Sequence, residues 1–294
     1  MSWALAVVQA LLFGDAQAPD CSNVPDPIVC TIDARFAKDA KAQTLAHELY
    51  KASGDLAATG VEEIMDGGFR GKIHLVPELP VGAYRKHLAW VTGTAAELDT
   101  LYTTLFVHVT PAYRWAYRWA YRWKELAIRF VRSPTKHTPS AYALIGPDDV
   151  WTIEYNVAGS LLTSEPAVRE LIVHELFHIN DEAHKDWSHH TLATDYAAIV
   201  KRCGTRSPCL APYAPNDTKM RATGIYYAFQ PDNGVMVREY AAELAVRYFR
   251  EQSEMLANKR LSRPPFKCGP TENGRAWNAL VDEFFAGVDL TPSC

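Results

Sequence analysis

Two histidines with a glutamate beside the first are the residues of this sequence best suited to chemistry. His174, Glu175 and His178 form the pattern His-Glu-x-x-His. Residues four apart on a helix are neighbours on one face, so two imidazole rings at this spacing can bind one tetrahedral metal ion. Glu175 points to the side of that face, where it can accept a proton from a metal-activated water. The spacing therefore predicts a catalytic zinc site with Glu175 as general base.

The segment around this motif has the pattern of a buried helix. Ser164 is a suitable N-cap, and Glu165 and Pro166 suit a first helical turn. Apolar residues then recur at helical spacing, at Val168, Leu171, Ile172, Leu176 and Ile179. We therefore expect a core helix that presents both histidines. The alternative is an accidental His-Glu-His set in an ordinary core helix.

A catalytic zinc ion needs a third protein ligand, and Glu239 is the favoured candidate. It lies on a predicted helix from Val235 to Arg250, and Glu243 follows one turn later. Two carboxylates on an otherwise apolar face are costly unless a cation lies opposite them. Glu239 can therefore bind zinc while Glu243 accepts the spare ring N–H of a ligand histidine. The alternative is a solvated helix edge, where Arg238 or Arg247 pairs with these acids.

His184 is the second candidate for the third ligand. With His174 and His178 it has the ligand spacing of the metzincin peptidases, HExxHxxGxxH. In that pattern the chain turns at a glycine, which is free to take positive φ, whereas this chain has Asp181 there. Asp can adopt such a conformation at some cost, so this alternative stays open.

The arrangement with Glu239 resembles the gluzincins, the thermolysin-like zinc peptidases. There, HExxH is followed by a later helix with a ligand Glu and a second acid four residues on, and the stretch from Arg238 to Glu243 is similar to that helix in lethal-factor-like members. The resemblance implies a zinc endopeptidase that acts on a protein or peptide substrate, and the alternative is a zinc amidase that acts on a cell-wall bond. It also implies a tyrosine that stabilises the oxyanion, for which Tyr227 is favoured over Tyr226, although either could be a core residue.

The same resemblance implies a zincin-like α+β fold with two lobes. We expect residues 19–180 to form an N-terminal lobe with a mixed sheet that ends in the zinc helix. Residues 181–294 would form a mainly helical, disulfide-braced lobe with the glutamate helix, and both lobes would make one catalytic domain. The alternating residues from Trp151 to Val157 predict a half-buried strand. By resemblance it would be the edge strand that pairs with the substrate backbone.

Other elements follow from local patterns. They are a helix from Arg35 to Ser53, strands from Lys72 to Val76 and from Glu125 to Val131, and a helix that begins at a capping box of Thr94 and Glu97 and reaches Tyr102. Residues 112–123 are three copies of Ala-Tyr-Arg-Trp. We interpret them as a tandem duplication in an exposed helix, and the alternative is a surface that contacts a membrane or a polysaccharide.

Composition limits the class of protein. The chain has 294 residues, 48% of them hydrophobic, and a net charge of −4 without a block of Lys and Arg. A disordered protein is therefore excluded, and no nucleic-acid partner is expected. The apolar run from Trp3 to Phe13, followed by Ala16-Gln17-Ala18, predicts a signal peptide at residues 1–18 and a secreted or periplasmic protein without stable membrane insertion.

Six cysteines remain after that segment, an even number that predicts three disulfides in an exported chain. Sequence alone allows about fifteen connectivities. Closeness in the chain favours Cys21–Cys30, Cys203–Cys209 and Cys268–Cys294.

Overall fold

The computed structural model describes residues 3–14, 16–67, 71–106, 125–146, 149–218, 223–231 and 235–294. The chain divides into two compact units. Unit 1 holds the chain up to Tyr102 and again from strand β4 to Glu175, and unit 2 includes the chain from Leu176 to Cys294. The Ala-Tyr-Arg-Trp repeat lies outside the described residues.

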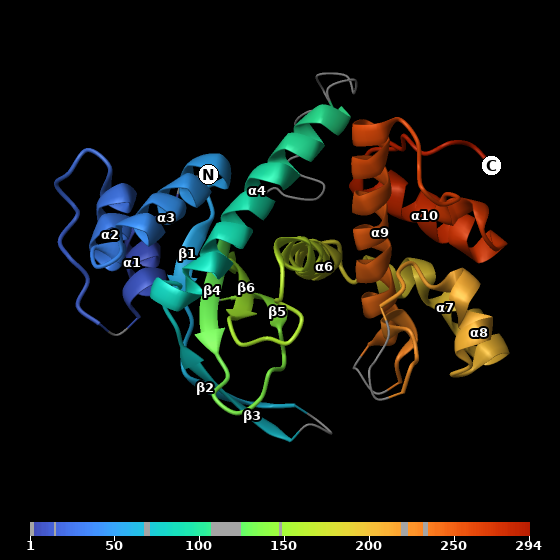
Figure 1. Ribbon diagram of the computed structural model, residues 1–294, viewed down its shortest axis with the longest axis horizontal. Coiled ribbons are helices and arrows are strands. Elements are labelled where there is room, and N and C mark those ends of the chain that lie inside the picture. Colours follow the sequence, from blue (N-terminus) through green and yellow to red (C-terminus); the bar gives the residue numbers. More distant parts are fainter. Residues whose placement is uncertain are drawn as a thin grey trace. The chain divides into compact units, whose positions relative to one another are not determined.

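Unit 1 is built on a mixed sheet, in which the described residues form six strands (Figure 1). They are β1 (Leu56–Thr59), β2 (Glu63–Asp66), β3 (Lys72–Pro77), β4 (Leu126–Arg132), β5 (Ala141–Ile145) and β6 (Trp151–Asn156). Their order is β2-β3-β4-β6-β5, with β1 also paired to β4. Strand β4 runs parallel to β1 and β6, whereas β3 is antiparallel to β4 and β5 is antiparallel to β6. The predicted strands at β3 and β4 are confirmed within one residue.

Strand β6 is internal, so the prediction of an edge strand from Trp151 to Val157 is wrong. It pairs with β4 on one side and with β5 on the other. All six of its residues are buried, including the polar Thr152, Glu154 and Asn156. The period-two pattern predicted one solvated face, but these polar side chains are covered. Among the described strands, β5 forms that edge of the sheet.

The N-terminal part of unit 1 contains helices α1 (Leu5–Phe13), α2 (Pro27–Phe36) and α3 (Ala40–Ser53). The predicted single helix from Arg35 is wrong at its start, because Arg35 belongs to the last turn of α2. The side chain of Asp39 then accepts a hydrogen bond from Ala42 N–H at 3.1 Å and caps a new helix. The helix ends at Ser53, as predicted, and Gly54 follows it with φ 77°.

Helix α1 coincides with the predicted signal peptide. Its Val8 and Leu12 are fully buried, and the helix packs against α2 and β1. The indole Nε1–H of Trp3 donates to Gly54 O at 2.7 Å. Removal of residues 1–18 after export stays a prediction. None of the helices described here combines the length and apolar character needed to cross a membrane.

Helix α4 (Arg85–Leu105) contacts both the sheet and the first half of helix α6 (Glu165–Ala183). The predicted start at Thr94 is wrong, because Thr94 is buried in the middle of α4. On the sheet side, His87 Nδ1 and the Tyr155 hydroxyl of β6 are hydrogen-bonded at 2.9 Å. On the other side, Glu97 Oε2 of α4 lies 2.6 Å from Arg169 Nη2 of α6. Helix α6 is therefore positioned on the sheet through α4.

Unit 2 is mainly helical, as the sequence predicted. Its described helices of at least one turn are the C-terminal part of α6 (Glu165–Ala183), α7 (Trp187–Cys203), α8 (Ser207–Leu210), α9 (Met236–Asn258) and α10 (Thr271–Phe284). Phe284 of α10 packs against Phe177 of α6 and Trp187 of α7, with ring centroids 5.3 Å and 5.0 Å apart. This aromatic contact packs the second half of α6 against α7 and α10.

Three disulfides brace the chain, in the pairing that closeness favoured. They are Cys21–Cys30, Cys203–Cys209 and Cys268–Cys294. Disulfides of this kind are typical of proteins that fold in an oxidising compartment. The mixed sheet and the helical unit 2 together make an α+β fold.

Candidate metal centre

Helix α6 begins where the sequence predicted. Ser164 precedes its first residue, and Ala167 N–H donates to Ser164 Oγ at 3.4 Å. Pro166 in the first turn lacks an N–H that would need a partner there. Four residues of the predicted apolar face are buried, namely Val168, Ile172, Leu176 and Ile179. Local capping and burial thus place the His-Glu-x-x-His motif in the middle of a continuous helix.

His174 and His178 lie one turn apart on this helix, and Glu239 of α9 lies beside them. One potential ligand atom of each residue lies within 4.8 Å of those of the other two. His178 Nε2 is 3.7 Å from Glu239 Oε1. His174 is buried, whereas His178 and Glu239 are partly exposed. The structure therefore brings together the three residues that the sequence proposed as metal ligands.

Glu239 lies in the first turn of its helix. Helix α9 begins at Met236, one residue after the predicted start, and continues beyond the predicted end at Arg250 to Asn258. A carboxylate in a first turn interacts favourably with the positive end of the helix dipole.

The arginines of α9 are engaged elsewhere. Arg238 pairs with two aspartates of the α6–α7 region, and Arg247 pairs with Glu251 at 2.6 Å. The alternative of a solvated helix edge, in which these arginines pair with Glu239 and Glu243, is therefore not what the structure contains.

Glu243, one turn after Glu239, is buried and held by an asparagine. Asn216 Nδ2 donates to both the carbonyl oxygen and Oε2 of Glu243, each at 2.9 Å. Asn216 Oδ1 in turn accepts from Arg250 at 2.8 Å. Sequence reasoning missed Asn216, since no local pattern links a loop residue to a distant helix. The role of Glu243 towards a ligand histidine stays a prediction.

Glu175 adjoins His174 on α6 and is buried, with 6% of its surface exposed. A buried carboxylate close to candidate metal ligands can exchange a proton with a water or a substrate group in the same enclosed space. Its role as general base stays a prediction.

His184 is not part of the metal group. Its Nδ1 lies 2.6 Å from Glu283 Oε1, and its ring lies 4.8 Å from that of Phe284. Among the described residues, the cluster of possible ligands contains His174, His178 and Glu239 without His184. The geometry therefore favours the first candidate for the third ligand.

Tyr226 and Tyr227 lie at the start of a short 3-10 helix, η6 (Tyr227–Phe229), that packs against α9. The backbone N–H of Tyr227 donates to Thr218 O at 2.8 Å, which fixes the start of this turn. Tyr226 is buried and Tyr227 is partly exposed. Both tyrosines thus lie on a segment in contact with the helix that carries Glu239, and the choice between them stays a prediction.

Tyr196 of α7 is a neighbour of the site that sequence reasoning missed. Its ring stacks on Phe229 with centroids 5.5 Å apart and lies 5.7 Å from Tyr240. Burial raises the pKa of Tyr196, and the negative charge of Glu239 raises it further. Tyr196 therefore stays protonated and can act only as a neutral hydrogen-bonding group near Glu239. No motif in the sequence singles it out.

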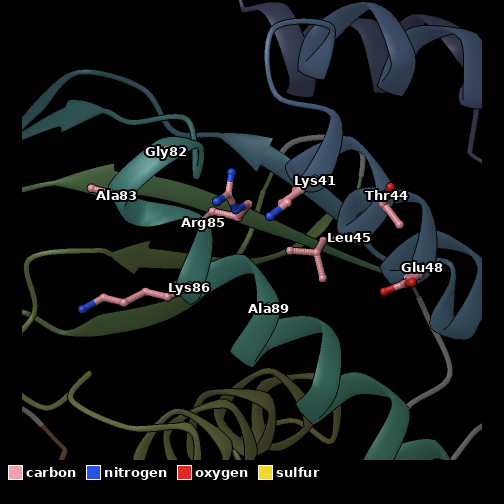
Figure 2. Close-up of a pocket in the computed structure, with 9 residues that line it drawn as sticks. All are labelled: Lys41, Thr44, Leu45, Glu48, Gly82, Ala83, Arg85, Lys86 and Ala89. Carbon is pink, nitrogen blue, oxygen red and sulfur yellow. The ribbon is translucent and has the colours of Figure 1, made fainter.

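A separate groove of about 540 Å³ lies between α3 and the start of α4 in unit 1 (Figure 2). Leu45 and Ala89 form part of its wall, and Lys41, Arg85 and Lys86 are the cationic residues along it. Its lining contains one acid and no histidine or cysteine. The groove therefore offers no set of metal ligands.

The fold and the site were compared with known proteins. No family model, no curated protein and no solved structure matches this chain. The functional conclusion therefore rests on the group formed by His174, His178 and Glu239.

Proposed function

We propose that this chain is a zinc-dependent endopeptidase, in which His174, His178 and Glu239 bind the metal and Glu175 is the general base. The observation that carries the proposal is the convergence of three possible ligand atoms from two helices within 4.8 Å of one another. Two of the three residues belong to a His-Glu-x-x-His motif on a continuous helix. The third lies on a helix on which Arg238 and Arg247 pair with other acids.

The donor set fits zinc. Two imidazole nitrogens and one carboxylate oxygen are a common ligand set for catalytic zinc, which leaves a fourth position for water or substrate. Ligand atoms around a tetrahedral zinc ion lie about 3.4 Å apart, given ligand distances of about 2.1 Å. The separation of 3.7 Å between His178 Nε2 and Glu239 Oε1 is close to this value. A small inward movement of the side chains would complete the coordination.

The proposed reaction assigns separate tasks to the protein groups. Zinc in such a site lowers the pKa of a water towards neutrality and polarises a carbonyl. Glu175 accepts the proton of the attacking water and passes it to the leaving nitrogen. Tyr227 donates a hydrogen bond to the oxyanion that develops on the substrate. The substrate class, a protein or peptide, follows from the resemblance to the gluzincins.

The sheet offers a place for an extended substrate. Strand β5 has β6 on one side and forms the edge of the described sheet on the other. A peptide can add a strand to such an edge through backbone hydrogen bonds. We therefore propose β5, in place of β6, as the strand that pairs with the substrate.

The three disulfides support a secreted or periplasmic enzyme. Under this proposal residues 1–18 direct export. N-terminal sequencing of the protein recovered from an exporting host tests this point, and a mature chain that still begins at Met1 would contradict a cleaved signal peptide.

The experiment that tests the function combines metal content with cleavage. The full chain, with its disulfides formed, is analysed for bound zinc and for casein cleavage with and without a chelator. Glu175→Gln should keep stoichiometric zinc but lower the cleavage rate by about 10²–10⁴-fold. His184→Ala, at the residue that follows the end of the same helix, is the matched control and should keep both zinc and activity.

Folded wild type without zinc would refute the proposal. Zinc binding without casein cleavage, but with cleavage of cell-wall muropeptides, would instead assign the site to an amidase.

A further inference from the structure

Arg238, the residue before the candidate ligand Glu239, contacts two aspartates from outside its own helix. Its Nε lies 3.8 Å from Asp181 Oδ2, and its Nη2 is hydrogen-bonded to Asp186 Oδ1. Asp181 is on α6, three residues after His178, and Asp186 is in the turn between α6 and α7. One guanidinium group therefore links the helix of Glu239 to the helix of His178.

Asp181 is a rigid anchor for this link. It is 1% exposed, and both of its carboxylate oxygens accept hydrogen bonds from the first turn of α7. Oδ1 accepts from Ser188 N–H and Oδ2 from Ser188 Oγ–H, each at 2.7 Å. A buried carboxylate with this many charge-assisted bonds has a single orientation. Asp181 is consequently held in place by Ser188, so a movement of α9 would stretch the contact between Arg238 and Asp181.

The turn that carries Asp186 has an unusual backbone. Lys185 and Asp186 both adopt left-handed conformations, with φ of 61° and 58°. Such conformations are unfavourable for residues other than glycine and persist only where the surroundings hold them. The N–H of Asp186 donates to Asp181 O at 2.9 Å, and the Asp186 carboxylate makes no capping bond to α7. That carboxylate is instead engaged by Arg238.

We propose that Arg238 is a positioning residue of the metal site. By bridging Asp181 and Asp186 it fixes the separation of α9 from α6, and thereby the distance between Glu239 Oε1 and His178 Nε2. The proposal rests on the proposed function, since it assumes that these residues bind zinc. As a positive charge near a cation, Arg238 would weaken zinc binding. As a bridge that preorganises the ligands, it strengthens binding, so the two roles predict opposite effects of its removal.

The test is the zinc affinity of the full chain, measured by competition with a chromophoric chelator. Arg238→Gln and Arg238→Lys should each lower the affinity by about 10–100-fold, the usual effect of losing a group that orients a ligand. Lys keeps the charge but lacks the planar fork that spans two carboxylates. Arg247→Gln is the matched control, because Arg247 is on the same helix and pairs with Glu251. Its zinc affinity should equal that of wild type.

Asp186→Asn is a second variant that tolerates the left-handed backbone and removes only the charge. It should also lower the affinity, and the double variant Arg238→Gln/Asp186→Asn should be no weaker than Arg238→Gln alone. Affinity that is unchanged or higher in Arg238→Gln, or wild-type affinity in Arg238→Lys, overturns the positioning role while zinc binding by wild type preserves the proposed function. Absence of zinc from folded wild type overturns both.

Discussion

Each unit contains a carboxylate that has little exposure to solvent and lies close to nitrogen atoms of other residues. The two carboxylates differ in which groups compensate their negative charge. In unit 1, Glu154 of β6 is 2% exposed, and its Oε1 lies 2.7 Å from Arg129 Nη2 on the neighbouring strand β4. The two residues are directly opposite in the strand register. In unit 2, Glu239 lies 3.7 Å from His178, whereas Arg238 and Arg247 of its own helix contact other acids.

The difference separates a structural acid from a candidate ligand. Burial raises the pKa of Glu154 to about 7, although Arg129 acts in the opposite direction and Glu63 adds to the rise. Its Oε2 has no hydrogen-bond partner among the described residues. The buried Glu154 carboxyl group is therefore stabilised by the neighbouring Arg129 and by a proton that it keeps up to about pH 7. Glu239 instead lies beside two histidines with which it could share a metal ion.

The largest expected difference between the two acids is the effect of their neutralisation on zinc affinity. Glu239→Gln removes an anionic ligand and should lower the zinc affinity by about 10³-fold or more. Glu154→Gln should leave the affinity unchanged, because Glu154 lies outside the metal group. Competition titration of both variants against wild type measures the effect. Equal losses in the two variants would show that the distinction between the acids is wrong.

Glu154 should make the fold more stable in mild acid than above neutrality. Its pKa is about 7 in the folded protein against an ordinary value of 4.5, so the folded state binds a proton that the unfolded state releases between these pH values. The free energy of unfolding should therefore fall by up to about 3 kcal/mol as pH rises from 4.5 to 7, and level off above. Glu154→Gln should remove this dependence in urea unfolding.

His87 requires that the comparison be made as a difference between wild type and variant. Burial lowers the pKa of His87 to about 4, so this residue destabilises the fold as pH falls through its ordinary value of 6.5. The variant retains His87, so subtracting the two curves isolates Glu154. A flat difference curve would mean that Arg129 keeps Glu154 ionised throughout.

Signals that are local in sequence predicted the elements of the candidate site well. Ser164 and the apolar periodicity located the start of α6, and short separations gave the disulfide pairing. The failed predictions at Thr94 and Glu154 share one physical cause, which is that tertiary packing buries residues whose local pattern is typical of exposed positions. Thr94 has the residue type of an N-cap, but its position in α4 is buried. Glu154 alternates with apolar residues as an exposed residue would, yet Arg129 and β5 cover it.

The residues of the candidate metal group could be proposed from the sequence, since the His-Glu-x-x-His motif identified His178 and the paired acids of a second predicted helix identified Glu239. The link between Arg238 and Asp181, which joins two helices far apart in the chain, was not predicted. No local propensity encodes such a pair, because its energy depends on where tertiary packing places the helices. The positioning of the site is therefore the part that needed the structure.

Zinc itself should stabilise unit 2 through Glu239. Zinc at a hundredfold its dissociation constant should raise the free energy of unfolding by about 2.7 kcal/mol, since the ion binds the folded state. Thermal unfolding of the metal-free chain with and without added zinc measures this increase. Glu154→Gln should show the same increase as wild type, and Glu239→Gln should show little. A similar rise in Glu239→Gln would mean that zinc binds elsewhere.

The smallest effect should come from Tyr142, which lies opposite Glu154 on β5. Its hydroxyl donates to Glu63 Oε1, and the charge of Glu63 raises the pKa of Glu154. Tyr142→Phe should cost about 1 kcal/mol of stability through the lost hydrogen bond. Without this hydrogen bond the Glu63 carboxylate is no longer held near Glu154, so the pH midpoint of the Glu154 effect should move down.

Tyr155→Phe is the matched control for this last prediction, because adjacent residues of a strand point to opposite faces. It also loses one hydrogen bond, to His87 on the α4 side of the sheet. It should therefore lower the stability by a similar amount without moving the midpoint. If both variants move the midpoint equally, the pKa of Glu154 responds to the packing of the whole sheet. The contrast with Glu239 would then rest on metal binding alone.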